Sequence, residues 1–92
     1  MLELTIAVAQ EDISCGVRMH CNRCPIARAM NRYFGPDANA DVGTRTISVW
    51  TGSGWQSQLR FTVPEDARDF ILDFDDKKPV SPQSFTFTLD SN

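Results

Sequence analysis

Apolar and polar residues alternate along four segments of the chain, which is the pattern of strands with one buried face. The alternating segments are residues 2–9, 46–50, 55–63 and 85–89. The turn-forming residues 51–54 (TGSG) separate the two middle segments and predict that these form a β-hairpin. The alternation therefore predicts a sheet with one apolar and one polar face.

In two other segments apolar residues recur every three or four positions, which predicts amphipathic helices. The first helix is expected over Pro25–Phe34, because proline suits the first helical position and Gly35-Pro36 is a strong stop signal. Its apolar stripe consists of Ile26, Ala29, Met30, Tyr33 and Phe34. The second helix is expected over Pro64–Phe74, with a stripe of Ala67, Phe70, Ile71 and Phe74.

Two shorter segments carry weaker signals. Residues 10–16 have acidic side chains early and Gly16 at the end, which predicts one helical turn. Residues 36–44 contain Asp, Asn and Gly around a lone Val42, which predicts a loop with room for a short edge strand.

The register of the hairpin is predicted by matching apolar residues across its strands. Pairing Trp50 with Gln56 sets Ile47 opposite Leu59. The core face then carries Ile47, Val49, Trp55, Leu59, Phe61 and Val63. The other face carries Thr46, Ser48, Trp50, Gln56, Gln58 and Arg60. One tryptophan, Trp50, is thus left on the polar side.

The strong elements follow one another in the order β-α-β-β-α-β. This order predicts an α+β fold of two layers, with two helices packed on one face of a mainly antiparallel sheet. The ferredoxin-like arrangement is the best-known topology of this kind. The length of 92 residues suits a single domain over residues 1–92, and the 41% of apolar residues supplies a hydrophobic core.

Charge and composition exclude several classes of function. The formal net charge is −3, so the chain lacks the basic surface from which nucleic-acid binding draws most of its affinity. No apolar stretch approaches the roughly 18 residues of a membrane span, and the N-terminal residues do not form a signal peptide. We therefore expect a cytoplasmic protein with reduced thiols, no membrane association and no cofactor.

The segment His20–Cys24 (HCNRC) is the one candidate for metal or thiol chemistry. Cys21 and Cys24 have the spacing of a zinc knuckle, which Cys15 and His20 would complete, but all four ligands crowd into ten residues. A redox pair at the helix start is a second alternative, although Pro25 makes Cys24 the helix cap and leaves Cys21 outside the helix. The favoured interpretation is that Cys24 caps the helix and that the other cysteines fill the core or a loop.

Trp50 is the stronger functional candidate. A tryptophan beside Gln56, Gln58 and Arg60 on an uncovered sheet face has the composition of an interaction surface or of a platform for a ring. The alternative is that this face is covered by another part of the chain or by a second copy in a homo-oligomer. Neither the acidic helix face nor the single histidine supplies catalytic residues, so we expect no enzyme.

Three short motifs and one predicted helix are spread over most of the chain. The motifs are residues 11–13 (EDI), residues 24–29 (CPIARA), and residues 74–80 with the pattern Phe-Asp-x-x-x-Pro-Val, and the helix is the one that begins at Pro64. With them the chain resembles a group of small accessory proteins encoded by actinobacterial phages. The resemblance implies action in the host cytoplasm and carries over no catalytic residues. Within the resemblance the Cys-Pro helix start is shared more than Cys15 or Cys21, which argues against a metal site of several cysteines.

These observations together predict a non-enzymatic, phage-encoded binding protein. It is expected to engage a host protein, or to sequester a small signalling molecule, in an anti-defence or host-takeover role. The alternative is a small structural-zinc or redox-thiol protein that uses Cys21 and Cys24.

Overall fold

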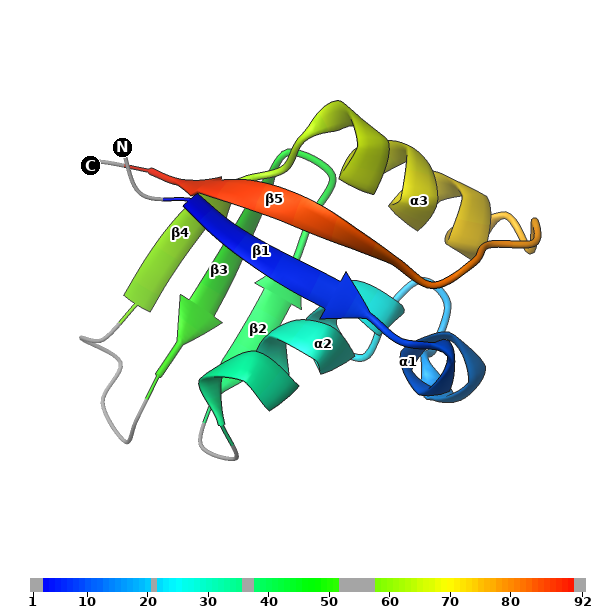
Figure 1. Ribbon diagram of the computed structural model, residues 1–92, viewed down its shortest axis with the longest axis horizontal. Helices are drawn as coiled ribbons and strands as arrows, with labels where there is room; N and C mark the ends of the chain where they lie inside the picture. The colour runs from blue at the N-terminus through cyan, green and yellow to red at the C-terminus, as the bar shows by residue number, and fades with distance from the viewer. Residues whose placement is uncertain (1–2, 21, 36–37, 52–57, 91–92) are drawn as a thin grey trace.

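The computed structural model describes residues 3–20, 22–35, 38–51 and 58–90. This part of the chain contains β1 (Glu3–Val8), α1 (Gln10–Cys15), α2 (Pro25–Phe34), β2 (Asn39–Val42), β3 (Thr46–Trp50), β4 (Gln58–Thr62), α3 (Glu65–Asp75) and β5 (Gln83–Leu89) (Figure 1). None of the helices in the described ranges has the length and apolar character needed to cross a membrane.

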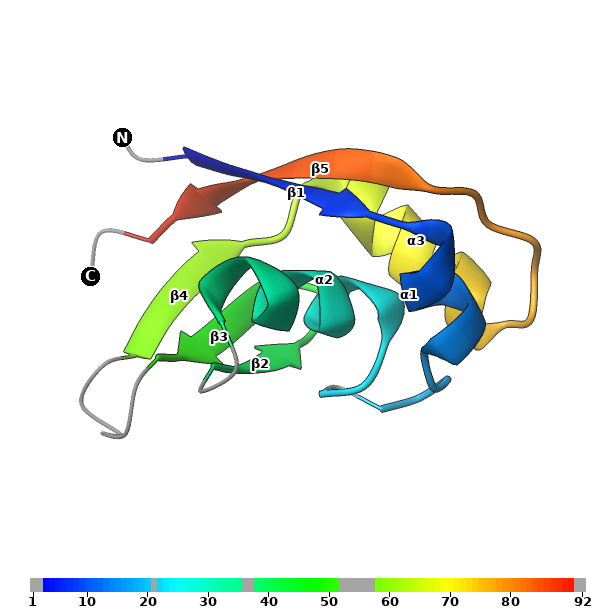
Figure 2. The same ribbon diagram turned by 60° about the horizontal axis from the view of Figure 1, so that its bottom comes forward.

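The strands form one antiparallel sheet in the order β1-β5-β4-β3-β2. β1 pairs with β5 along its whole length, but β4 pairs with β5 only through Phe61↔Leu89 and Thr62↔Thr88. The short β4–β5 contact lets the sheet curl, and α2 lies inside the curl between the two edge strands, β1 and β2 (Figures 1 and 2).

The α+β class and the antiparallel sheet are thereby confirmed. The predicted two-layer packing in β-α-β-β-α-β order is not confirmed, because the sheet curls and further elements are present, and the strand order is not the ferredoxin-like one. The strand order places β1 at an edge, beside the last strand. The two segments with weaker signals both form regular elements. Residues 10–15 form α1, which precedes α2, and residues 39–42 form β2, a fifth strand that buries Ala40 and Val42. The physical reason is that alternation predicts strands but carries no information on which strands become neighbours.

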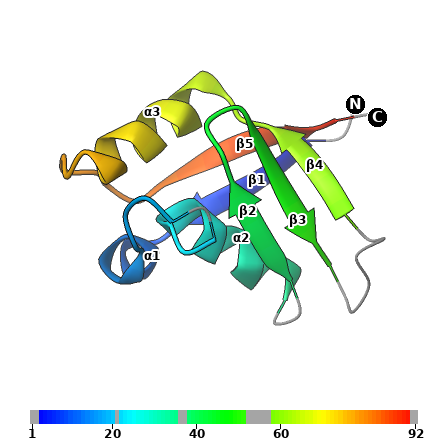
Figure 3. The same cartoon turned by 180° about the vertical axis from the view of Figure 1, so that it is seen from behind.

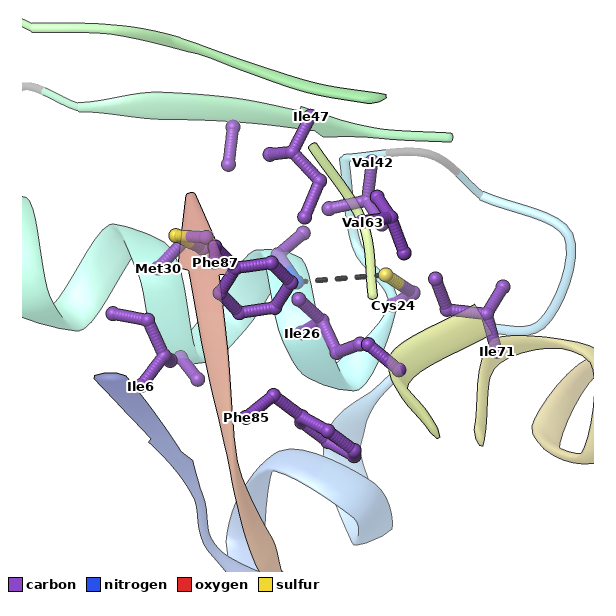
Figure 4. Close-up of a cluster of buried hydrophobic side chains, with 14 of the residues drawn as sticks. Ile6, Cys24, Ile26, Met30, Val42, Ile47, Val63, Ile71, Phe85 and Phe87 are labelled. Atoms are coloured by element: carbon purple, nitrogen blue, oxygen red, sulfur yellow. Dashed lines mark hydrogen bonds between the residues drawn. The ribbon is translucent and has the colours of Figure 1, made fainter. Parts of the chain in front are cut away.

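One hydrophobic core fills the inside of the curled sheet (Figure 4). Its largest fully buried side chains are Ile6, Pro25, Ile26, Met30, Ile47, Val49, Phe85 and Phe87, together with the acidic Asp12. α3 contributes Phe70, whose ring centroid lies 5.2 Å from that of Phe85. Of the helix residues expected in the core, Tyr33 is instead 59% exposed, because it lies in the last turn of α2, where the helix ends before the core is closed.

The hairpin register differs from the predicted one by two residues. Trp50 pairs with Gln58, which sets Ile47 opposite Phe61 and thereby matches two large apolar side chains. Because side chains alternate with a period of two, a shift by two residues leaves the described side chains of β3 and β4 on their predicted faces. Trp55 lies outside the described residues.

Gly16 follows α1 at a point where its backbone lies very close to Asp12 and Pro25. A Cβ atom at Gly16 would lie 2.7 Å from the Asp12 carbonyl oxygen and 2.8 Å from Cδ of Pro25. Its backbone φ of −68° suits any residue, so the requirement for glycine is steric.

We therefore expect Gly16→Ala to lower the free energy of unfolding by about 1–3 kcal/mol, the usual effect of overpacking. The matched control is Gly43→Ala, whose Cβ would meet only the Thr46 carbonyl oxygen at 3.1 Å and which should cost less. Urea unfolding of both variants provides the measurement. Equal stabilities of the two variants would show that the contact with Pro25 does not constrain the α1–α2 connection.

Candidate functional site

Trp50 lies on the face of the sheet opposite the core, as predicted. Its cross-strand neighbours are Asn39 on β2 and Gln58 on β4, so amide side chains stand on both sides of the indole. Figure 3 shows β2, β3 and β4 from this face, with α2 behind the strands. The indole is half-buried, and Gln58 is exposed. We call the outward residues of these strands, Asn39, Asp41, Thr46, Ser48, Trp50, Gln58, Arg60 and Thr62, the Trp50 face.

The next row of the Trp50 face carries opposite charges. Asp41 on β2 and Arg60 on β4 stand on either side of Ser48 on β3. Both charged side chains are exposed. Gln58 and Arg60, which were predicted to form the binding surface together with Trp50, thus lie on the same face as the indole. The third predicted residue, Gln56, lies outside the described residues.

A second polar cluster, which the sequence did not indicate, surrounds Asp12. The Asp12 side chain has no solvent exposure. Its Oδ1 and Oδ2 accept hydrogen bonds of 2.6 and 2.7 Å from the two terminal nitrogens of Arg32, and Oδ2 also accepts from the Ala9 N–H at 2.9 Å. Arg32 donates a further hydrogen bond to the Ala7 carbonyl oxygen at 3.1 Å. The pair therefore joins the end of β1, the start of α1 and the last turns of α2.

Electrostatics explain why a buried carboxylate is tolerated at this point. Burial alone would raise the pKa of Asp12, but the hydrogen bonds from Arg32 and Ala9 and the charges of Arg32 and Arg28 together hold its pKa below the ordinary value of 3.8. The hydrogen bond to Asp12 raises the pKa of Arg32 further above its ordinary range. Asp12 is therefore ionised at neutral pH.

Arg28 stands beside this pair without joining its hydrogen bonds. Its Nε lies 3.7 Å from Oδ1 of Asp12 and has no hydrogen-bond partner among the described residues. Two guanidinium groups thus face one carboxylate, and Glu11 adds a second negative charge that acts on Arg32. The sequence offered a partial signal, because an acidic residue in the first turn of α1 and two arginines one helical turn apart on α2 were visible, but nothing indicated that they meet.

The structure does not gather the candidate metal ligands that it describes into one site. Cys15 and His20 are exposed, whereas Cys24 is 6% exposed and caps α2, with its Sγ accepting a hydrogen bond from the Ala27 N–H at 3.4 Å (Figure 4). Cys21 lies outside the described residues. In the described ranges, no three side chains of the His, Cys, Asp and Glu types form a group that could hold a metal ion.

His20 and Cys24 line a common cavity of about 250 Å³ at the N-terminus of α2. Its other walls are Met19, Val42, Gly43, Thr44, Ile71 and Asp75. The backbone N–H of Met19 donates to Oδ1 of Asp75 at 3.0 Å, which fixes this loop against α3.

Comparison with known proteins adds no family to this description. No protein-family model matches the chain, and neither a curated protein nor a solved structure is similar to it. The geometry itself offers a polar sheet face centred on an indole and an ion pair that holds α2 in place.

The ion pair predicts a specific dependence of stability on pH. Because the pKa of Asp12 is lowered by folding, its contribution is fully present above the ordinary aspartate pKa and is lost as pH falls through the native value. Asp12→Asn should therefore cost about 1.5–3 kcal/mol at pH 7, the range for hydrogen bonds to charged groups, and less at pH 2.

Arg32→Gln should cost more than Asp12→Asn at pH 7, about 3 kcal/mol or above, because it leaves a buried carboxylate without its main partner. The control is Asp76→Asn, which removes an exposed pair with Lys78 and should cost less than about 0.5 kcal/mol. Urea unfolding between pH 2 and pH 7 measures all three variants. A constant difference between the wild type and Asp12→Asn over this range would contradict the assigned role of the carboxylate.

Proposed function

We propose that the chain is a non-enzymatic binding protein that engages a protein partner through the Trp50 face. The observation that carries this proposal is the placement of a half-buried indole between two amide side chains on a sheet face that no helix covers. Tryptophan is enriched among residues that dominate binding energy, and amides around it supply hydrogen bonds at the rim of an interface.

The shape of the face favours a protein over a small molecule. The sheet curls around α2, so the Trp50 face is its convex side (Figure 2). Small ligands bind in concave sites that bury most of their surface, whereas a protein surface can dock on a convex or flat face. Asp41 and Arg60 add one charge of each sign, which would fix the orientation of a partner.

The resemblance to actinobacteriophage accessory proteins supplies the expected partner class. On this basis we propose that the partner is a host protein in the bacterial cytoplasm. Binding would serve host takeover or escape from a defence system. The zinc or thiol alternative has less support, because Cys24 is buried and already accepts a helix N–H, and Cys15 and His20 are exposed.

The test replaces Gln58 of this chain with a photo-crosslinking amino acid, p-benzoylphenylalanine, and expresses the chain in actinobacterial host cells. The matched control places the same amino acid at Leu72, an exposed position on α3 that is 51% accessible and does not belong to the Trp50 face. We expect one discrete crosslinked protein from position 58 and none from position 72. Crosslinking of the same protein from both positions, or from neither, would contradict the proposal.

Trp50→Ala in the crosslinkable chain provides the second arm. If the indole is an interface hot spot, its removal should weaken binding to the identified protein by about 2 kcal/mol or more. Urea unfolding of the same variant separates lost binding from lost folding. Unchanged affinity in a folded Trp50→Ala variant would overturn the assignment of this face.

A further inference from the structure

A second surface feature lies on the core side of the sheet, at its open end. There a cavity of about 290 Å³ is lined almost entirely by apolar side chains: Leu4, Tyr33, Phe34, Leu59, Phe61 and Leu89. Glu3 is the one charged residue among its walls. The cavity exists because β4 and β5 pair over only two residues and because α2 ends at Phe34, so that neither the sheet nor the helix closes this end of the core.

The apolar walls of this cavity are incompletely buried. Leu4, Phe34, Leu59 and Leu89 pack against the core but keep partial exposure, and Tyr33 is 59% exposed. The aromatic wall is ordered by ring contacts, with centroid separations of 5.1 Å between Tyr33 and Phe34 and 6.3 Å between Phe34 and Phe61. A preformed concave site of apolar and aromatic side chains is the usual form of a small-ligand pocket, and this one has the size for a short alkyl chain.

A second cavity of about 230 Å³ shares one wall residue, Tyr33, with the first. Its other walls are Thr5, Ile6, Ala7, Ala29 and Arg32. Arg32 is 53% exposed and makes three hydrogen bonds, two to Asp12 and one to the Ala7 carbonyl oxygen, which leave two of its five N–H groups for another acceptor.

The polar groups around the two cavities differ from one end to the other. Near Arg32, the guanidinium groups of Arg28 and Arg32 face the carboxylate of Asp12, and Glu11 also acts on the charge of Arg32, so the four charges balance while Arg32 keeps unused N–H donors. At the far end of the apolar cavity stands Glu3. An elongated ligand with an anionic group would therefore find a hydrogen-bond donor at the Arg32 end and be repelled by Glu3 at the other, which sets its orientation.

We propose that these two cavities, which share Tyr33, bind an amphipathic carboxylate, with its alkyl chain in the apolar cavity and its carboxylate on an unused N–H group of Arg32. A charge-assisted hydrogen bond from arginine to a carboxylate is stronger than a hydrogen bond between neutral groups. This site lies on the core side of the sheet and does not depend on the Trp50 face.

The test titrates the intact chain with octanoate, 1-octanol and octylamine, three probes with the same alkyl chain, below their aggregation limits. Binding is followed by two-dimensional nitrogen–proton NMR. We expect octanoate to bind at least about tenfold more tightly than either other probe, to shift the backbone signals of Leu4 and Leu59, and to shift the Nε–H signal of Arg32 but not that of Arg60. Added salt should weaken the binding of octanoate and leave that of 1-octanol unchanged.

Two variants locate the site without disturbing the Asp12–Arg32 pair. Leu59→Gln and Tyr33→Ala, both at partly or fully exposed positions, should each weaken octanoate binding severalfold while the chain stays folded. Trp50→Ala should leave octanoate binding unchanged, so that failure of this site and failure of the Trp50 face are distinguishable.

Four outcomes would overturn the proposal. Equal binding of 1-octanol would show a cavity that selects only apolar chains, and preference for octylamine would show that Glu3 governs the site. Signal shifts confined to the Trp50 face would place the ligand elsewhere. Absence of binding by all three probes would show that the cavities hold no amphipathic ligand.

Discussion

The ion pair between Asp12 and Arg32 fixes the position of the helix around which the sheet curls. Asp12 is the one fully buried charged side chain among the described residues, and it is bonded simultaneously to α2 through Arg32 and to the start of α1 through the Ala9 N–H. Arg32 in turn bonds the last part of β1 through Ala7. A buried charge is costly unless it is paired, so these contacts are satisfied only when β1, α1 and α2 adopt one relative arrangement.

The position of α2 determines both candidate surfaces. Because α2 occupies the inside of the curl, the outward side chains of β2, β3 and β4 have no helix above them, and Trp50 remains on an open polar face. At its other end α2 stops before it covers the β4–β5 junction, so Tyr33 and Phe34 border an apolar cavity instead of completing the core. An open polar face and an apolar cavity thus arise on opposite sides of the sheet from the same placement of α2.

The cysteine-rich segment has a structural role in the part that the structure describes. Cys24 caps α2, the Pro25 ring packs against Gly16, and together these residues begin the helix at the point where α1 ends. A thiol that accepts a backbone N–H and is almost fully buried contributes to helix initiation in the same way as a serine or aspartate cap. This explains a Cys-Pro helix start without any requirement for a metal.

The sequence by itself determined which segments form the main strands and helices and which face each side chain occupies. The period of two along β3 places Trp50 on the face opposite Ile47 and Val49. The observed register shift is an even number of residues, so the apolar faces of β3 and β4 still match and the prediction for Trp50 holds. The helix Pro25–Phe34 was likewise given by its proline start and glycine stop. Strand order, the edge position of β1, the exposure of Tyr33 and the meeting of Asp12 with Arg32 were decided only by the tertiary structure. The physical reason is that local periodicity reflects burial along one element, whereas neighbouring strands and an ion pair across twenty residues depend on which elements pack together.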